Sequence, residues 1–357
     1  MRLSTSLLAV ALFVSAANVA LGGDHAPWPS DWNNWNDPAL WAAVGNPGNA
    51  GEQSRALYSD TTYYGGVAYN YQIGKYEVTA GQYTAFLNAV AATDTYGLYN
   101  YAMGSHGTQG CNIQRSGVSG SYKYTVADDY ANRPVNYVSW GDAARFCNWL
   151  GNGQLTGAQD ASTTEDGSYY INGATSNTAL MAVTRKTSAT FVIPTENEWY
   201  KAAYYKGSGT SAGYWVYPTK TTTAPGRDMS ELTNPGNNAN SGGSPYPIDS
   251  GAYYTTNVGE FQLSASPYGT FDQGGNVAEW NETAWGPYSC GIRGGDFAED
   301  VVNLGTSYRY SQFPTDERSE TGFRVAYVPE PGSLTLLVCG AIAFLIWRQR
   351  RKENLRL

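Results

Sequence analysis

The sequence predicts an α+β domain with little regular secondary structure, and three observations support this prediction. Residues 71–78 alternate polar side chains with aromatic and β-branched ones, which is typical of a strand. Thr79, Ser139 and Thr195 each stand where a helix cap is expected, directly before a stretch with helical spacing. The rest of the chain is rich in Gly, Asn, Ser, Thr and Tyr, which favours short strands and long loops. Such loops often carry binding or catalytic residues.

The first expected helix follows Thr79, because apolar side chains recur on one face after it. They are Tyr83, Phe86, Leu87 and Val90. A second helix begins at Ser139, where Asp142 stands three positions on, close to a capping box. Its apolar face comprises Ala143, Phe146, Cys147 and Leu150. A third, shorter helix begins at the Thr195–Glu198 capping box.

Composition excludes several classes of protein. Of 357 residues, 14% are aromatic and only 15% charged, which argues against intrinsic disorder. The net charge of −8 argues against a nucleic-acid partner, because no basic groove is available for phosphates. Two His in the chain exclude a His-rich metal site.

Residues 1–22 have the pattern of a secretory signal peptide: a positive start, a short apolar core and small residues at the cleavage positions. The alternative is a buried N-terminal helix. The apolar core is too short to span a bilayer, which needs ~20 residues. We expect an exported chain with an N-terminal lead segment at 23–59.

The C-terminal residues 329–357 have three parts in a fixed order. Pro329, Glu330 and Pro331 come first, a short apolar run at 334–347 follows, and a basic cluster ends the segment. The run is short for a transmembrane span, and the basic end would stay cytoplasmic. This order resembles the PEP-CTERM sorting signal, although an ordinary tail anchor is the alternative. The resemblance implies transient anchoring in the membrane, processing by an exosortase-type protease near Pro329–Pro331, and a final place at the cell surface or outside the cell.

Three cysteines lie outside this tail. Export permits disulfides, so a Cys111–Cys290 bridge stays open. Cys147 falls on the apolar face of the second helix, and we expect a buried thiol there.

Several blocks in order resemble the formylglycine-generating enzyme family, the sulfatase-modifying-factor domain. The blocks are YQIGKYEV at 71–78, PVNYVSWGDAARFCNWL at 134–150, IPTENEWYKAA at 193–203, PYGTFDQGGNVAEW at 267–280, IRGGD at 292–296, YRY at 308–310 and GFRV at 322–325. The resemblance covers residues 60–328. It implies a variant of the C-type-lectin-like fold, in which the first and last strands pair. Within the blocks, the tryptophans are expected in the core, and Arg309 and Arg324 are expected to brace loops.

The family's enzymes oxidise a cysteine of a client sulfatase with molecular oxygen, using two cysteines that bind copper(I). In this chain the matching interval, 296–307, contains no cysteine. Glu299 falls near the first family position, Ser307 occupies the second, and Asp296 replaces a serine. Copper(I) prefers soft thiolates, so we assign no catalytic residue and do not expect copper.

The resemblance also implies calcium, a hard cation that takes six to eight oxygen ligands. The positions matching one family site are Asp272, Gly275, Val277 and Glu279. A second site maps less closely onto Asn240, Ser241, Asp249 and Gly251. The alternative for Asp272 and Glu279 is turn capping and a surface pair.

Two functions follow. The first is a non-catalytic, calcium-stabilised binding or matrix module whose partner is a glycan, an exopolysaccharide or a protein. The alternative is a formylglycine-generating oxidase, or another metal-dependent oxygenase acting on a protein thiol, with its metal at Asp296, Glu299 and Ser307. The empty cysteine interval favours the binding module.

Overall fold

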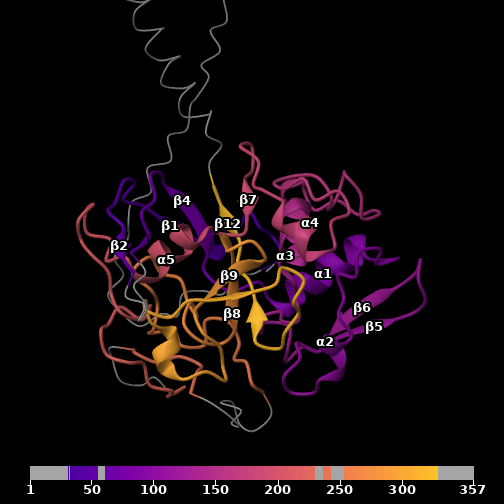
Figure 1. The fold of residues 1–357 in the computed structure, drawn as a ribbon. Coiled ribbons are helices and arrows are strands. Elements are labelled where there is room, and N and C mark those ends of the chain that lie inside the picture. Colours follow the sequence, from indigo (N-terminus) through magenta and orange to yellow (C-terminus); the bar gives the residue numbers. More distant parts are fainter. Residues whose placement is uncertain (1–30, 32, 55–60, 230–235, 243–252, 329–357) are drawn as a thin grey trace, which may run out of the picture.

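The computed structural model describes residues 31, 33–54, 61–229, 236–242 and 253–328 (Figure 1). The expected signal peptide at 1–22 lies outside the described residues. So do the sorting tail, with Pro329, Glu330 and Pro331, and two of the expected calcium ligands, Asp249 and Gly251.

The first sheet brings the two ends of the domain together. Its strand order is β1-β4-β12-β7, with bounds Trp41–Val44, Tyr71–Gly74, Ala326–Tyr327 and Phe191–Val192. β12 pairs antiparallel with β4, with Ala326 opposite Ile73, as expected for the first and last strands. β1 pairs with the other edge of β4, so part of the 23–59 lead segment belongs to the domain's own sheet.

The second sheet has the order β10-β9-β8-β11. The strands are β8 (Ala278–Trp285), β9 (Ser289–Arg293), β10 (Tyr310–Gln312) and β11 (Thr321–Gly322), and β11 runs parallel to β8. Two small hairpins complete the strands: β2 (Glu52–Gln53) with β3 (Tyr63–Tyr64), and β5 (Ile113–Ser116) with β6 (Lys123–Val126). In Figure 1 the β5–β6 hairpin projects at one side of the molecule, beside α1 and α2.

All three expected helices form, and each begins at its expected cap. They are α1 (Ala80–Val90), α3 (Trp140–Gly151) and α5 (Glu196–Tyr204). Each cap is a complete capping box, in which the cap hydroxyl and the side chain three positions on satisfy each other's backbone N–H groups. Shorter turns are η1 (Pro38–Leu40), α2 (Ala102–Ser105), α4 (Asn177–Met181) and η2 (Val301–Leu304).

The expected strand at 71–78 is shorter in the structure, where β4 ends at Gly74, and the last segment forms two short strands, β11 and β12. The Arg324 guanidinium donates to the carbonyls of Gly74 and Lys75 at 2.9 and 3.2 Å, next to the end of β4. Beyond β4, Lys75 N donates to Leu40 O and Val78 N donates to Phe323 O, so backbone hydrogen bonds continue there without a regular ladder.

The main core lies between α1, α3 and the first sheet. Phe86 and Phe146 pack edge to face at 5.2 Å between ring centroids, and Phe146 contacts Phe323 at 5.4 Å. The tryptophans expected in the core are buried, with Trp140, Trp149, Trp199 and Trp280 at most 3% exposed. Among the described residues, every helix is too short or too polar to cross a membrane.

Candidate functional site

A cavity of about 250 Å³ lies beside the second sheet, at the interval where the family places its cysteines. β8, β9 and β10 form one wall, and the turn after Gly295 and the segment before β11 form the rest. Its lining comprises Ala278, Ile292, Arg293, Gly295, Asp296, Glu299, Tyr308, Tyr310, Gln312, Arg318 and Glu320. The site is therefore small and mostly polar.

A tight glycine turn directs Asp296 into this cavity. Gly295 has φ 64°, and a Cβ added there would lie 2.9 Å from Leu304 Cδ2, so only glycine fits without strain. Phe297, 5% exposed, anchors the turn, and its N–H donates to Asn276 O at 3.0 Å. Ala298 N donates to Asp296 Oδ1 at 2.8 Å. The Asp296 carboxylate is thus held by a backbone N–H of its own turn.

Among the described residues, no lysine or arginine forms an ion pair with Asp296, Glu299 or Glu320, the carboxylates of the cavity. Asp296 is only 5% exposed, and burial, with the charges of Glu299 and Glu320, raises its pKa to about 7. The Tyr308 hydroxyl donates to Glu299 Oε1 at 2.7 Å. Glu299 Oε2 is enclosed, and no donor among the described residues reaches it. Because Glu299 Oε2 is enclosed, the carboxylates that the cavity offers to a hydrogen-bond donor are those of Asp296 and Glu320.

The arginines near the cavity are held elsewhere. Glu196, at the start of α5, accepts from Arg293 Nε at 2.7 Å and from Arg309 Nε at 2.6 Å. Arg293 also donates to Tyr308 O at 2.6 Å, which fixes the loop that forms the cavity wall. Arg309 lies over the Trp285 ring at 4.0 Å. Arg309 therefore braces the site, as expected.

A second polar centre lies in the interior, around Glu279 and Arg324, both 0% exposed. Arg324 Nε and Nη2 donate to Glu279 Oε2 and Oε1 at 2.5 and 2.6 Å. Trp199 Nε1 donates to Glu279 Oε2 at 2.7 Å. Both carboxylate oxygens are thus engaged by protein donors, and the bracing role expected of Arg324 is confirmed.

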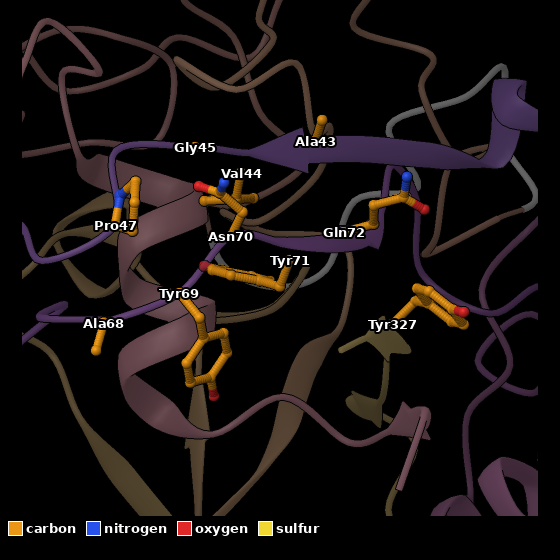
Figure 2. A pocket seen from close by; sticks show the side chains of 10 residues that line it. All are labelled: Ala43, Val44, Gly45, Pro47, Ala68, Tyr69, Asn70, Tyr71, Gln72 and Tyr327. Carbon is orange, nitrogen blue, oxygen red and sulfur yellow. The ribbon is translucent and has the colours of Figure 1, made fainter. Parts of the chain in front are cut away.

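A larger groove of about 680 Å³ runs along β1 and β4. Figure 2 shows Pro47 and Ala68 at one end and Tyr327 beside Gln72 at the other. Tyr69 is held by its hydroxyl, which donates to Glu198 Oε1 at 2.6 Å. The lining is mainly apolar and offers no charged side chain among its described residues.

The sequence matches the family model described as "Sulfatase-modifying factor enzyme 1-like domain" over residues 65–328. The chain belongs to the sulfatase-modifying-factor family. No curated protein matches it.

Three solved structures are similar to the chain at low sequence identity. Treponema denticola variable protein 1 is similar with 21% identity and a TM-score of 0.48, covering 81% of this chain and 95% of that one. CarF has 21% identity and a TM-score of 0.44, covering 81% and 98%. PvdO from Pseudomonas aeruginosa has 18% identity and a TM-score of 0.43, covering 81% and 91%. The family match and the mixed helices and strands support the α+β, C-type-lectin-like fold that the family resemblance implied.

Relative to the sulfatase-modifying-factor enzymes, this chain has no thiol pair at the cavity. Cys111, Cys147 and Cys290 are all free and buried, so the Cys111–Cys290 bridge left open above does not form. Burial raises the pKa of Cys111 to about 11 and that of Cys290 to about 12. Cys290 Sγ lies 3.7 Å from Met181 Sδ. Burial therefore favours the neutral thiol over the thiolate at these cysteines.

The structure separates the two residues matched to the family's cysteines. Glu299 lines the cavity, whereas Ser307 is exposed and does not. The alternative metal site required Asp296, Glu299 and Ser307 together. Asp296 lines the cavity beside Glu299, but Ser307 does not, so the three residues are not brought together. Sequence reasoning missed Tyr310, Gln312, Arg318 and Glu320. Tyr310 and Gln312 lie in β10, and Arg318 and Glu320 precede β11. The YRY block was a signal for Tyr310, but the sequence did not show that β10 meets β9 or that β11 meets β8.

At the first position expected for calcium, the donors do not fit the ion as they stand. Glu279 faces Arg324, and Asp272 Oδ2 accepts from Gly259 N at 2.5 Å. Burial raises the pKa of Asp272 to about 7. Binding of an ion by Asp272, Gly275, Val277 and Glu279 would have to displace the guanidinium, so calcium there stays a prediction.

The second expected calcium position has one feature that fits a cation. Asn240 is 1% exposed, and its Oδ1 accepts no hydrogen bond from the described residues. Ser241, beside it, is 3% exposed. The described residues contain no group of three or more His, Cys, Asp or Glu side chains placed to hold a metal ion. Any calcium here would therefore depend on carbonyl and amide oxygens and on residues outside the described part.

Proposed function

We propose that this chain is a non-catalytic binding module built on the sulfatase-modifying-factor fold, with its ligand site at the cavity beside β8, β9 and β10. The observation that carries the proposal is that the two positions matched to the family's cysteines hold Glu299 and Ser307, and that Glu299 lines the cavity together with Asp296. Copper(I) is a soft ion that carboxylates hold poorly. The cavity offers fixed hydrogen-bond acceptors and aromatic walls instead, which suit recognition.

The neutral state of the remaining thiols supports the same proposal. A thiol is a metal ligand or nucleophile only as the thiolate, and burial disfavours that form at Cys111, Cys147 and Cys290. The Arg293–Glu196–Arg309 clamp keeps the cavity wall in place without ligand. A preformed site binds with a small cost in ordering.

Copper binding and thiol oxidation test this proposal. We expect the full-length chain, loaded with copper(I) and offered a sulfatase-motif cysteine peptide, to retain no stoichiometric copper and to consume no oxygen above background. Metal analysis after gel filtration and mass spectrometry of the peptide are the measurements. A formylglycine-generating enzyme tested in parallel is the positive control. Stoichiometric copper with peptide turnover would establish the oxidase alternative and overturn the proposal.

We also propose that calcium stabilises the domain through Asn240. The orphaned Oδ1 of Asn240 supports this proposal, because calcium binds amide and carbonyl oxygens. Saturating calcium at about 100 times its Kd would add about 2.7 kcal/mol to the stability. We therefore expect calcium to raise the Tm of the wild type by about 5 °C or more, and Asn240→Ala to abolish that increase.

The matched control is Asn257→Ala, whose amide makes a single long hydrogen bond to Glu260 at 3.4 Å. This variant should keep the full response to calcium in the same thermal melts. An unchanged response of Asn240→Ala would exclude Asn240 as a ligand.

The two ends of the chain lead to a proposal about location. We propose that the chain is exported, held transiently in the membrane by residues 329–357, and released to the surface by an exosortase-type protease. The signal-like residues 1–22 and the Pro329–Pro331 motif support it. Mass spectrometry of the mature chain from its native host should find termini near residues 23 and 329. An intact C-terminus would contradict the processing step.

A further inference from the structure

The first sheet has one buried side and one open side. Its strands pair antiparallel, and residues directly opposite each other point to the same side of a sheet. Ile73 and its partner Ala326 point inward and are 0% exposed. Gln72 and its partners Ala43 and Tyr327 point the other way, and all three are exposed. We call this open side the outer face of the first sheet.

The outer face carries aromatic side chains where the solvated side of an antiparallel sheet usually carries polar ones. Trp41, Phe191 and Tyr327 form a cluster across three strands. The ring of Tyr327 lies 5.2 Å from that of Phe191 and 6.2 Å from that of Trp41, between centroids. Tyr327 is 37% exposed, and the other two are half-buried. An exposed apolar surface of this kind marks a contact with a partner or a membrane.

The cluster continues into the groove along β1 and β4. Tyr327 belongs to both, and Figure 2 shows it beside Gln72 at one end of the groove. The described residues that line the groove include no charged side chain. Contact with an apolar partner would therefore bury no charge there, which removes the largest cost of such a contact.

The sequence that follows Tyr327 indicates which partner this surface meets. The apolar run at 334–347, which lies outside the described residues, begins seven positions after Tyr327. Seven residues span at most about 25 Å when fully extended, so a bilayer that holds this run lies no farther than that from Tyr327. In Figure 1, β12 lies with β1, β4 and β7 in the same upper part of the molecule. The whole outer face is thus close to the point at which the tail is attached.

The side chains of the outer face suit the headgroup region of a bilayer. Trp and Tyr gather at membrane–water interfaces, because each has an apolar ring and one polar group. Each such contact is weak for a free domain. An attached anchor keeps the surface at a high effective concentration beside the membrane, so a weak contact is enough.

We propose that the outer face of the first sheet, with Trp41, Phe191, Tyr327 and the groove, lies on the surface of the lipid bilayer while the tail is anchored. The contact would orient the domain and hold Pro329–Pro331 at the membrane surface, where a membrane-bound protease can reach them. The proposal rests on the anchoring proposed above and adds the orientation of the domain on the membrane.

Quenching of a fluorescent label by lipid tests the proposal. Gln72→Cys places a bimane label on the outer face. Val118→Cys, at a residue 71% exposed in the turn of the β5–β6 hairpin, is the matched control. Both chains carry Cys339→Ser so that the tail is not labelled, and the other three cysteines are buried. The full-length chains are reconstituted into phosphatidylcholine vesicles that contain a lipid with a nitroxide on its headgroup. We expect at least twofold stronger quenching at position 72 than at position 118.

A second pair of variants tests the aromatic cluster itself. Tyr327→Ser, made in the chain labelled at position 72, should bring the quenching down toward that at position 118. Phe313→Ser removes another exposed aromatic ring, 50% exposed and outside the cluster, and should leave the quenching unchanged. Circular dichroism checks that both variants are folded.

Flotation of the vesicles reports the anchoring separately from the contact. Chains that float but show equal quenching at the two labels would overturn the contact alone and leave the anchoring standing. Chains that do not float would overturn both. Equal quenching, together with a shift in the emission of the label at position 72 when host exopolysaccharide is added, would assign the outer face to a glycan and overturn the proposal.

Discussion

Glu279→Gln is expected to lower the free energy of unfolding by about 3–5 kcal/mol, because it leaves the charged, buried Arg324 guanidinium without its ion-pair partner. Arg324 cannot move to solvent, since it also donates to Phe271 O at 2.9 Å and to Gly74 O at 2.9 Å. For a domain of this size the loss corresponds to a fall in Tm of roughly 6–20 °C. Thermal melts and urea unfolding measure it.

Asp166→Asn is the matched control for this variant. It breaks the Lys186–Asp166 pair, whose side chains are 35% and 38% exposed, and exposed pairs contribute about 0–1 kcal/mol. A loss as large in the control as in Glu279→Gln would contradict the assignment of the effect to burial.

The same variant distinguishes the ion pair from the calcium role that the sequence suggested for Glu279. An ion pair with Arg324 contributes equally in calcium and in chelator, so we expect equal losses of Tm in both. A calcium ligand would produce a loss in calcium only. That second result would show that the ion displaces Arg324 from Glu279.

Asp296→Asn is expected to stabilise the domain at pH 8 by up to about 4 kcal/mol and to have little effect at pH 4. The pKa of Asp296 is raised from 3.8 to about 7 by burial, then by Glu299 and Glu320. A raised carboxyl pKa means that the folded state holds the proton more tightly than the unfolded state. Stability is therefore reduced as pH rises from about 4 to 7, and the full cost is present above pH 7. Asparagine removes this cost and can still accept from Ala298 N.

Urea unfolding of both proteins at pH 4, 6 and 8 measures this effect. The difference between variant and wild type should grow with pH and level off above pH 7. Asp128→Asn, which removes an exposed charge, should show no such growth. A constant difference at all three pH values would mean that Asp296 does not titrate in this range.

The elements predicted most accurately from sequence are those determined by neighbouring residues. The caps at Thr79, Ser139 and Thr195 lie within three positions of their partners, and each helix begins where its cap predicts. The strand at 71–78 was predicted too long: β4 ends at Gly74, whose carbonyl accepts from Arg324, 250 positions on. Alternation along a segment carries no information about such a distant donor.

In the candidate site, too, the features determined within one segment were predicted and those that depend on distant segments were not. Asp296 and Glu299 were found because the ordered family blocks point to one interval of the chain. Glu320 and Tyr310 were missed, because their place beside Asp296 depends on β11 pairing with β8 and β10 with β9. The partner of Glu279 was missed as well. Spacing suggested a turn with Asp272, whereas the structure pairs Glu279 with Arg324, 45 positions on.

The position of β12 within the first sheet has a consequence for the order in which the chain folds. β12, at Ala326–Tyr327, lies between β4 and β7, so the sheet lacks an interior strand until almost the whole domain has been synthesised. Contacts between residues so distant in sequence slow folding, because a long loop must close before they form. Until β12 is made, β4 and β7 have no partner along the edges that β12 occupies in the folded sheet. During synthesis the chain emerges with its N-terminus first. We therefore expect it to stay incompletely folded until β12 has been made. An incompletely folded chain can still pass through a membrane pore or bind a chaperone.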